Sequence, residues 1–95
     1  MVTRDDAREI AEQQLQQLYA DGADALAIDD RATREEDFGW IFFYQSKKYL
    51  NDGDPDERLV GNAPIVVDRD GEMHMTGTGE ALDHYLEEIR TRLGF

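Results

Sequence analysis

GWIFFY, residues 39–44, is the most densely apolar stretch of an otherwise polar chain, and it contains the only tryptophan. Alternate residues of a β-strand point to opposite faces, so Trp40, Phe42 and Tyr44 would share one side and the residues between them the other. An unbroken apolar run is typical of a strand that is buried on both faces, or of one that offers a face to a partner. We therefore predict that this stretch, continued to about Ser46, is the central strand of a sheet.

Two amphipathic helices are predicted near the ends of the chain. The first begins at a Thr3 cap and ends at Asp21-Gly22, where glycine suits a left-handed C-cap. The second opens at Gly77-Thr78-Gly79, with Thr78 as its candidate cap, and ends at Gly94-Phe95. Both have apolar residues at the three- and four-residue spacing that gives a helix one buried stripe.

Three further strands are predicted around the central one. Residues 25–33 form a first strand at an edge, and Glu35-Glu36-Asp37 is a charged turn. Residues 65–67 and 72–76 form a hairpin, whose turn Asp68-Arg69-Asp70-Gly71 places glycine where positive φ is needed. The order α-β-β-β-β-α predicts an α+β fold in which an antiparallel four-stranded sheet packs against two helices.

The segment from Lys47 to Gly61 is predicted to be a long connection, anchored to the body by Tyr49, Leu50 and Leu59. The two helices are enough to cover one face of the central strand. We expect the other face to be covered by this connection, by a second copy of the chain, or by a target. A homodimer is therefore one of the open alternatives.

Length and charge narrow the class of protein. Ninety-five residues suit a single domain, which we place at residues 1–95. The 22 acidic against 10 basic residues give a formal net charge of -12, which disfavours nucleic acid and anionic membranes as partners. The same charge would steer a basic protein partner toward the chain, although it is also the ordinary signature of a solubilising surface.

The absence of cysteine excludes disulfides, thiolate metal sites and cysteine nucleophiles. The first residues lack the basic start and apolar core of a signal peptide, and no apolar run reaches the roughly 18 residues of a membrane span. We expect a cytoplasmic protein.

The candidate general bases are His74 and His84, and neither has a sequence neighbour that would complete a catalytic site. His84 lies among acidic residues of the final helix, and His74 is expected on a strand beside the hairpin turn. We therefore expect no enzyme activity and no cofactor. A small hydrolase would need a pocket that gathers one of these histidines with carboxylates.

Asp52, Asp54 and Asp56 have the odd spacing with which a calcium loop begins. The sixth and twelfth positions of such a loop require glycine and glutamate, but here they hold Glu57 and Ala63. The segment therefore does not predict a metal site.

Three stretches form a pattern when they are taken together: Gly39-Trp40 through Tyr49-Leu50, then Leu59-Val60-Gly61-Asn62-Ala63-Pro64 with Val67-Asp68, then Gly71-Glu72 with Gly77-Thr78 and the Tyr85-Leu86 helix. This pattern resembles the immunity protein 35 family, the YrhB-like domain, from about residue 37 to residue 90. The residues that match the family's motif are Trp40, Gly61, Asn62, Pro64 and Gly77. A buried tryptophan, a turn and a strand-entry proline explain most of them structurally.

The resemblance implies a non-enzymatic, cytoplasmic protein of bacterial polymorphic toxin systems, which binds a toxin and neutralises it. It identifies neither the toxin nor any catalytic residue. YrhB-like proteins have also been associated with a chaperone-like role. The alternative is therefore a chaperone-like or general protein-interaction module that uses exposed apolar surface around the central strand.

The acidic groups of the chain are the candidate contacts for a toxin with a basic surface, because charge complementarity would make association fast and salt-sensitive. They are Asp52, Asp54, Asp56 and Glu57 in the long connection, with Asp29, Asp30, Glu35 and Glu36 in the first half of the chain.

Overall fold

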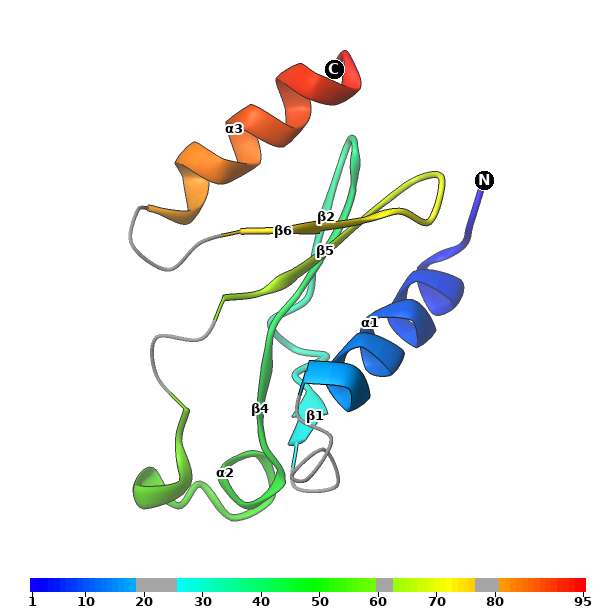
Figure 1. The fold of residues 1–95 in the computed structure, drawn as a ribbon. Helices are drawn as coiled ribbons and strands as arrows, with labels where there is room; N and C mark the ends of the chain where they lie inside the picture. Colours follow the sequence, from blue (N-terminus) through cyan, green and yellow to red (C-terminus); the bar gives the residue numbers. More distant parts are fainter. Residues whose placement is uncertain (19–25, 60–62, 77–80) are drawn as a thin grey trace.

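The computed structural model describes residues 1–18, 26–59, 63–76 and 81–95 (Figure 1). The elements are α1 (Arg4–Leu18), β1 (Leu26–Ile28), β2 (Arg34–Glu36), β3 (Gly39–Phe42), β4 (Tyr44–Ser46), α2 (Lys47–Asp52), the 3-10 helix η2 (Pro55–Glu57), β5 (Ile65–Asp68), β6 (Met73–Met75) and α3 (Leu82–Leu93). The chain is an α+β fold with a helix first and last, as predicted.

An antiparallel sheet of four strands, in the order β2-β3-β5-β6, forms the centre of the fold. Trp40 of β3 lies opposite Val67 of β5, and Phe42 lies opposite Ile65. The predicted central strand divides at Phe43, because β4 leaves this sheet and pairs with β1 in a separate two-stranded ladder. The predicted four-stranded sheet is present, but the first predicted strand lies outside it and β2 takes its place.

The charged segment Arg34–Glu36 forms the edge strand β2, so the prediction of a turn at Glu35-Glu36-Asp37 is wrong. The chain turns one residue later, at Asp37-Phe38, and places Phe38 in the core with 1% of its surface exposed. Gly39 allows this hairpin to lie close to β5, because a Cβ there would be 2.1 Å from the carbonyl oxygen of Val67. An edge strand tolerates charged side chains that face solvent, and those of β2 are exposed or half-buried.

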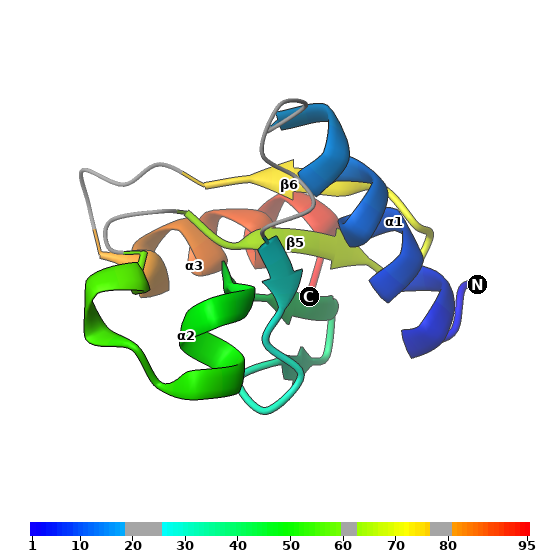
Figure 2. The ribbon, with the colours of Figure 1, turned by 90° about the horizontal axis from the view of Figure 1, so that it is seen from below.

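The two long helices, α1 and α3, cover opposite faces of the sheet (Figure 1 and Figure 2). The core on the α1 side consists of Ala7, Ala11, Leu15, Ile28, Trp40, Phe42, Tyr44, Ile65 and Val67. The core on the α3 side consists of Phe38, Ile41, Val66, Leu86 and Ile89, with Phe43 packed against it. The expectation that both helices share one face is therefore wrong. Each helix has one apolar stripe, and both apolar faces of β3 are covered without a second copy or a target.

The predicted long connection contains regular structure. Ser46 caps α2 by accepting a hydrogen bond from the amide of Tyr49 at 3.1 Å, and Gly53 ends the helix with a φ of 69°. Asp54 then caps η2 by accepting from the amide of Asp56 at 3.0 Å. A helix of six residues is too short to show the apolar periodicity that identifies longer helices, and so the sequence pattern did not reveal it.

The predicted start of the first helix and the predicted end of the last agree with the structure, whereas α3 begins at Leu82 after an Ala81 N-cap and not at the predicted Gly77-Thr78-Gly79. Thr3 caps α1, because its hydroxyl accepts from the amide of Asp6 while the Asp6 carboxylate accepts from the amide of Thr3, both at 3.1 Å. Gly94 ends α3 with a φ of 84°. The predicted end at Asp21-Gly22 and the predicted cap at Thr78 lie outside the described residues.

Candidate interaction surface

Asp29 and Asp30 line a hollow at the end of the molecule where α2 lies beside β1 (Figure 1), and Gly53 of the second predicted acidic segment lines it too. The hollow has a volume of about 460 Å³ and is lined by Ile28, Asp29, Asp30, Arg31, Tyr49, Leu50 and Gly53. In the chain, Gly53 lies between Asp52 and Asp54, and Asp56 follows in η2. We call the lining together with Asp52, Asp54 and Asp56 the acidic hollow.

The β1 side of the acidic hollow is held by hydrogen bonds to two other elements. The amide of Asp29 donates to the carbonyl of Phe43 at 2.8 Å, which ties the loop after β1 to the central strand. Arg8 of α1 donates to both carboxylate oxygens of Asp30, from Nε at 2.7 Å and from Nη2 at 3.2 Å. Such a bidentate pair fixes geometry as well as charge, so this loop is docked on α1.

The chain segment on the α2 side is fastened to the body by Gln45 of β4. Its side-chain amide donates to the carbonyl of Leu59 at 3.0 Å, and its side-chain oxygen accepts from the amide of Leu59 at 2.8 Å. Gln45 therefore completes both backbone hydrogen bonds of Leu59, whose side chain packs on the core of the α1 side. The segment between them, which carries α2 and η2, is a loop with both ends fastened to the body.

The negative charges of the acidic hollow differ in how far they are compensated. Asp30 is paired with Arg8. Asp52 and Asp56 are exposed, and no lysine or arginine of the described residues forms an ion pair with either. The guanidinium carbon of Arg58 lies 5.9 Å from the ring centroid of Tyr49, so this ring already has a cation at its face. The lining itself contains two carboxylates, one arginine, Arg31, and an aromatic wall, and the free carboxylates of Asp52 and Asp56 belong to the adjoining chain segment.

Glu35 and Glu36 are not part of this surface. They lie on β2, which Figure 1 shows toward the end of the sheet away from α2, and both are paired within the chain. Arg69 donates to Glu35 at 3.2 Å and Arg34 donates to Glu36 at 2.6 Å. The side chain of Glu57 lies outside what the structure describes. Of the eight acidic candidates, Asp29 and Asp30 therefore line the hollow, Asp52, Asp54 and Asp56 belong to the chain segment around its lining residue Gly53, and Glu35 and Glu36 lie elsewhere.

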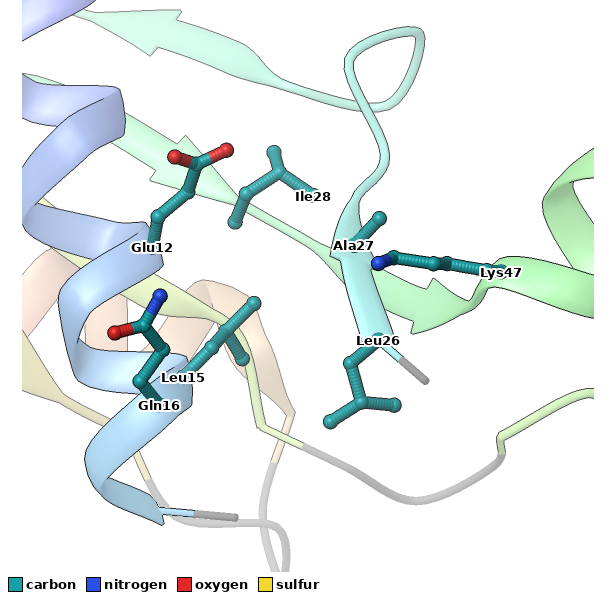
Figure 3. Close-up of a pocket in the computed structure, with 7 residues that line it drawn as sticks. All are labelled: Glu12, Leu15, Gln16, Leu26, Ala27, Ile28 and Lys47. Atoms are coloured by element: carbon teal, nitrogen blue, oxygen red, sulfur yellow. The ribbon is translucent and has the colours of Figure 1, made fainter. Parts of the chain in front are cut away.

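A second hollow, between α1 and β1, is shown in Figure 3 and has a volume of about 220 Å³. Leu15 and Leu26 form its apolar walls, while the side chain of Lys47 reaches toward β1 beside Ala27. It contains one lysine and one carboxylate, that of Glu12, so its lining has no net charge. Charge complementarity with a basic partner therefore favours the acidic hollow.

A polar network that is buried at Asp68 and exposed at Arg92 joins β5, β6 and α3, and the sequence pattern did not reveal it. The Asp68 carboxylate is buried, and its Oδ1 accepts from the amides of Asp70 at 2.9 Å and Glu72 at 3.0 Å. Its Oδ2 lies 2.8 Å from Nε2 of His74, and Nδ1 of His74 lies 3.3 Å from Nη2 of Arg92. Because the guanidinium donates to Nδ1, the ring proton belongs on Nε2 and is donated to Asp68.

The environment of Asp68 stabilises its charged form. Burial by itself would raise the pKa of the Asp68 carboxyl, but the hydrogen bonds from His74 and from the amides of Glu72 and Asp70 outweigh it, so the pKa lies below its usual range. Both ring nitrogens of His74 are engaged, which makes the histidine a link between the hairpin and α3. In this arrangement His74 is not poised to act as a general base.

His84 is exposed, with its Nε2 3.3 Å from a carboxylate oxygen of Glu88 on the same helix. No cluster of three or more metal-ligating side chains occurs among the residues that the structure describes. Within the same residues, no helix has both the length and the apolar character that crossing a bilayer requires.

Comparison with known proteins gives the family. The family profile described as Immunity protein 35 matches residues 5–88. The chain belongs to the immunity protein 35 family. Trp40, one of its motif residues, is 3% exposed in the core beneath α1, and Pro64 is buried at the entry to β5. Gly61, Asn62 and Gly77 lie outside the described residues.

Among curated proteins, this immunity protein 35 chain is similar to the uncharacterized protein YrhB of Escherichia coli (strain K12). The two are 40% identical over 55 residues, which cover 57% of this chain and 58% of YrhB. No solved structure matches the chain.

Proposed function

We propose that this member of the immunity protein 35 family binds a bacterial toxin and neutralises it, with the acidic hollow as the contact surface. Family membership, from the match over residues 5–88, is the observation that carries the proposal. The choice of surface is supported by the hollow, whose lining combines Asp29 and Asp30 with apolar contact area from Tyr49 and Leu50, and by the exposed carboxylates of Asp52 and Asp56 in the adjoining chain segment.

The physical basis is charge complementarity with a basic cleft on the toxin. Asp52 and Asp56 have no cationic partner among the described residues, so their charges are available to an incoming lysine or arginine. Complementary charges raise the rate of encounter, and exposed ones are screened beyond about 10 Å at 0.1 M salt. Toxin binding through this surface should therefore weaken as salt rises.

The protein would act by occlusion, as a non-enzymatic inhibitor in the bacterial cytoplasm that belongs to a polymorphic toxin system. A homodimer is not needed to bury the central strand, because α1 and α3 cover its two faces. We propose a single domain over residues 1–95 as the unit that binds.

The test begins with the protein product of the neighbouring reading frame, or with proteins captured by the chain from lysate of its own cells. A candidate toxin is co-expressed with the chain, and growth is measured. In the test variant, Asp52, Asp54 and Asp56 become Asn and Glu57 becomes Gln. Asparagine still caps η2 at position 54, so the fold should persist.

The matched control removes four exposed acidic charges elsewhere, by Glu9→Gln, Asp83→Asn, Glu87→Gln and Glu88→Gln. Protection should fall sharply in the test variant and be retained in the control. Equal protection by both variants would show that the acidic hollow is not the contact. Failure of the unaltered chain to protect against any such candidate would count against the inhibitor proposal itself.

The alternative is a chaperone-like or general interaction module, and the edge strand β6 is the feature that favours it. Met73 and Met75 are 40% and 52% exposed, and they lie opposite Val67 and Ile65 at a sheet edge. The expected apolar surface around the central strand is absent, because both faces of β3 are buried. Salt-tolerant suppression of client aggregation, lost on Met73→Ser and Met75→Ser, would favour this alternative.

A further inference from the structure

Two of the exposed large apolar side chains, those of Met1 and Phe95, lie at a third hollow. Its volume is about 430 Å³, and its apolar walls are Met1, Phe38, Leu93 and Phe95. Met1 is 98% exposed and Phe95 is 56% exposed, whereas Phe38 is buried and forms part of the wall. We call this hollow the Phe95 pocket. It lies at the end of α3, beside the β5–β6 turn, and Figure 1 shows this end of the molecule opposite α2.

The charged side chains that line the Phe95 pocket have partners within the chain, with one exception. Asp37 is paired with Arg90 of α3 at 2.5 Å. The guanidinium of Arg69 is held by Glu35, at 3.2 Å, and by the carbonyl of Glu36, at 2.6 Å. Asp68, also in the lining, is joined through His74 to Arg92.

The exception is Asp70, at the tip of the β5–β6 turn. Its side chain is exposed, and no lysine or arginine of the described residues forms an ion pair with it. The pocket therefore presents one side-chain carboxylate that has no ion-pair partner among the described residues, beside an apolar cavity. A ligand that fills the cavity would be favoured if it placed a positive charge a few ångströms from its apolar part.

We infer that the Phe95 pocket is a docking site for a protein partner that inserts an apolar side chain and pairs an adjacent lysine or arginine with Asp70. Its volume falls within the range of roughly 300–1,000 Å³ that ligand pockets occupy, which is enough for one aromatic or large aliphatic side chain. The inference does not depend on the acidic hollow or on inhibition of a toxin.

The experiment is a titration of the isotope-labelled full chain by nuclear magnetic resonance at 0.1 M salt, with backbone amide shifts as the readout. The probe is phenethylamine, which joins an aromatic ring to a cation. Hydrocinnamate replaces the cation by an anion on a similar spacer, and phenethyl alcohol replaces it by a neutral group. The variants are Asp70→Asn and Phe95→Ala, both at exposed side chains, so the fold should persist.

Phenethylamine should shift the amides of Asp70, Leu93 and Phe95 saturably. An exposed ion pair contributes up to about 1 kcal/mol, so the amine should bind up to about fivefold more tightly than the alcohol, and hydrocinnamate should bind most weakly. Asp70→Asn should bring the amine to the affinity of the alcohol. Phe95→Ala should weaken all three probes.

Two controls separate the pocket from general attraction to an acidic protein. Removing charge from the acidic hollow, by Asp52→Asn and Asp56→Asn, should leave the affinity of phenethylamine at the Phe95 pocket unchanged within about twofold, because α2 lies at the end of the molecule opposite the C-terminus (Figure 1) and salt screens exposed charges. The inference is overturned if the pocket amides do not shift saturably, if the three probes bind alike, or if the strongest shifts fall at the acidic hollow.

Discussion

Replacement of Asp68 by alanine measures how strongly the buried network holds the β5–β6 hairpin to α3. The carboxylate accepts three hydrogen bonds, from the amides of Asp70 and Glu72 and from the ring of His74, at 2.8–3.0 Å. Each such bond contributes about 1 kcal/mol net, and a buried donor left without a partner adds about 1–3 kcal/mol. We expect Asp68→Ala to lower the free energy of unfolding by about 3–5 kcal/mol.

Asp68→Asn separates the two parts of the network, which are the hydrogen bonds within the β5–β6 turn and the link through His74 to Arg92 of α3. Its side-chain oxygen can still accept from both backbone amides, but its NH₂ group would face the proton on Nε2 of His74. Moving that proton to Nδ1 would turn an N–H toward Arg92 and remove the contact at 3.3 Å. The turn is kept and the link to α3 is lost, so we expect a smaller cost of about 1–2 kcal/mol.

The assay is urea unfolding followed by the fluorescence of Trp40, which is the only tryptophan and is 3% exposed in the native state. The slope of free energy against urea should be unchanged between variants if the native and unfolded states keep their exposed areas. A cost below about 1 kcal/mol for Asp68→Ala, or equal costs for the two variants, would refute this account of the network.

The same variants carry a pH signature. The folded pKa of Asp68 lies below its usual range, so the ionised carboxylate stabilises the fold above the unfolded pKa, which is about 3.9 for aspartate. That contribution is lost as the pH falls through the folded pKa. The difference in stability between the unaltered chain and Asp68→Asn should therefore be full at pH 7 and should shrink in the acid range below about pH 4.

Three further substitutions each test one contact that stabilises the fold. Gly39→Ala places a methyl group 2.1 Å from the carbonyl oxygen of Val67 and should cost about 3 kcal/mol or more, measured by thermal unfolding; an unchanged midpoint would contradict the close approach. Arg69→Met removes the contacts to the β2–β3 hairpin and the guanidinium that lies 4.4 Å from the Trp40 ring, so we expect a loss of about 1–2 kcal/mol and altered fluorescence. Gln45→Leu removes both hydrogen bonds to Leu59, and hydrogen exchange should become faster across α2 and η2 while it stays unchanged in α1.

The limits of prediction are clearest at β2 and at the central strand. The charges of Glu35 and Glu36 indicated a turn, but their side chains lie at a sheet edge, where the backbone can pair while the carboxylates stay in solvent. What holds the hairpin is Phe38 in the core and the absence of a side chain at Gly39, and both depend on β5 lying against it. The contact between this hairpin and β5 joins residues far apart in the chain, so no local sequence pattern indicates it.

In the candidate site too, the sequence indicated individual residues but not which of them lie close together, as the acidic candidates and His74 show. Asp29 and Asp30 are separated by about twenty residues from Gly53, and only the pairing of β1 with β4 brings them to the hollow that Gly53 also lines. His74 was expected on a strand, facing away from Met73 and Met75, and this prediction is confirmed. Its partner Arg92 comes from α3 and could not be inferred from spacing on the hairpin.

The sequence by itself determined the central apolar strand, the two amphipathic helices, the Asp-Gly hairpin and the acidic character, because periodicity, turn chemistry and charge are properties of neighbouring residues. Only the tertiary structure decided which face each helix covers, which strands share the sheet, and which charged side chains meet. These choices depend on contacts between residues far apart in the chain. Both faces of β3 are apolar and each helix has a single apolar stripe, so each helix covers a different face of β3.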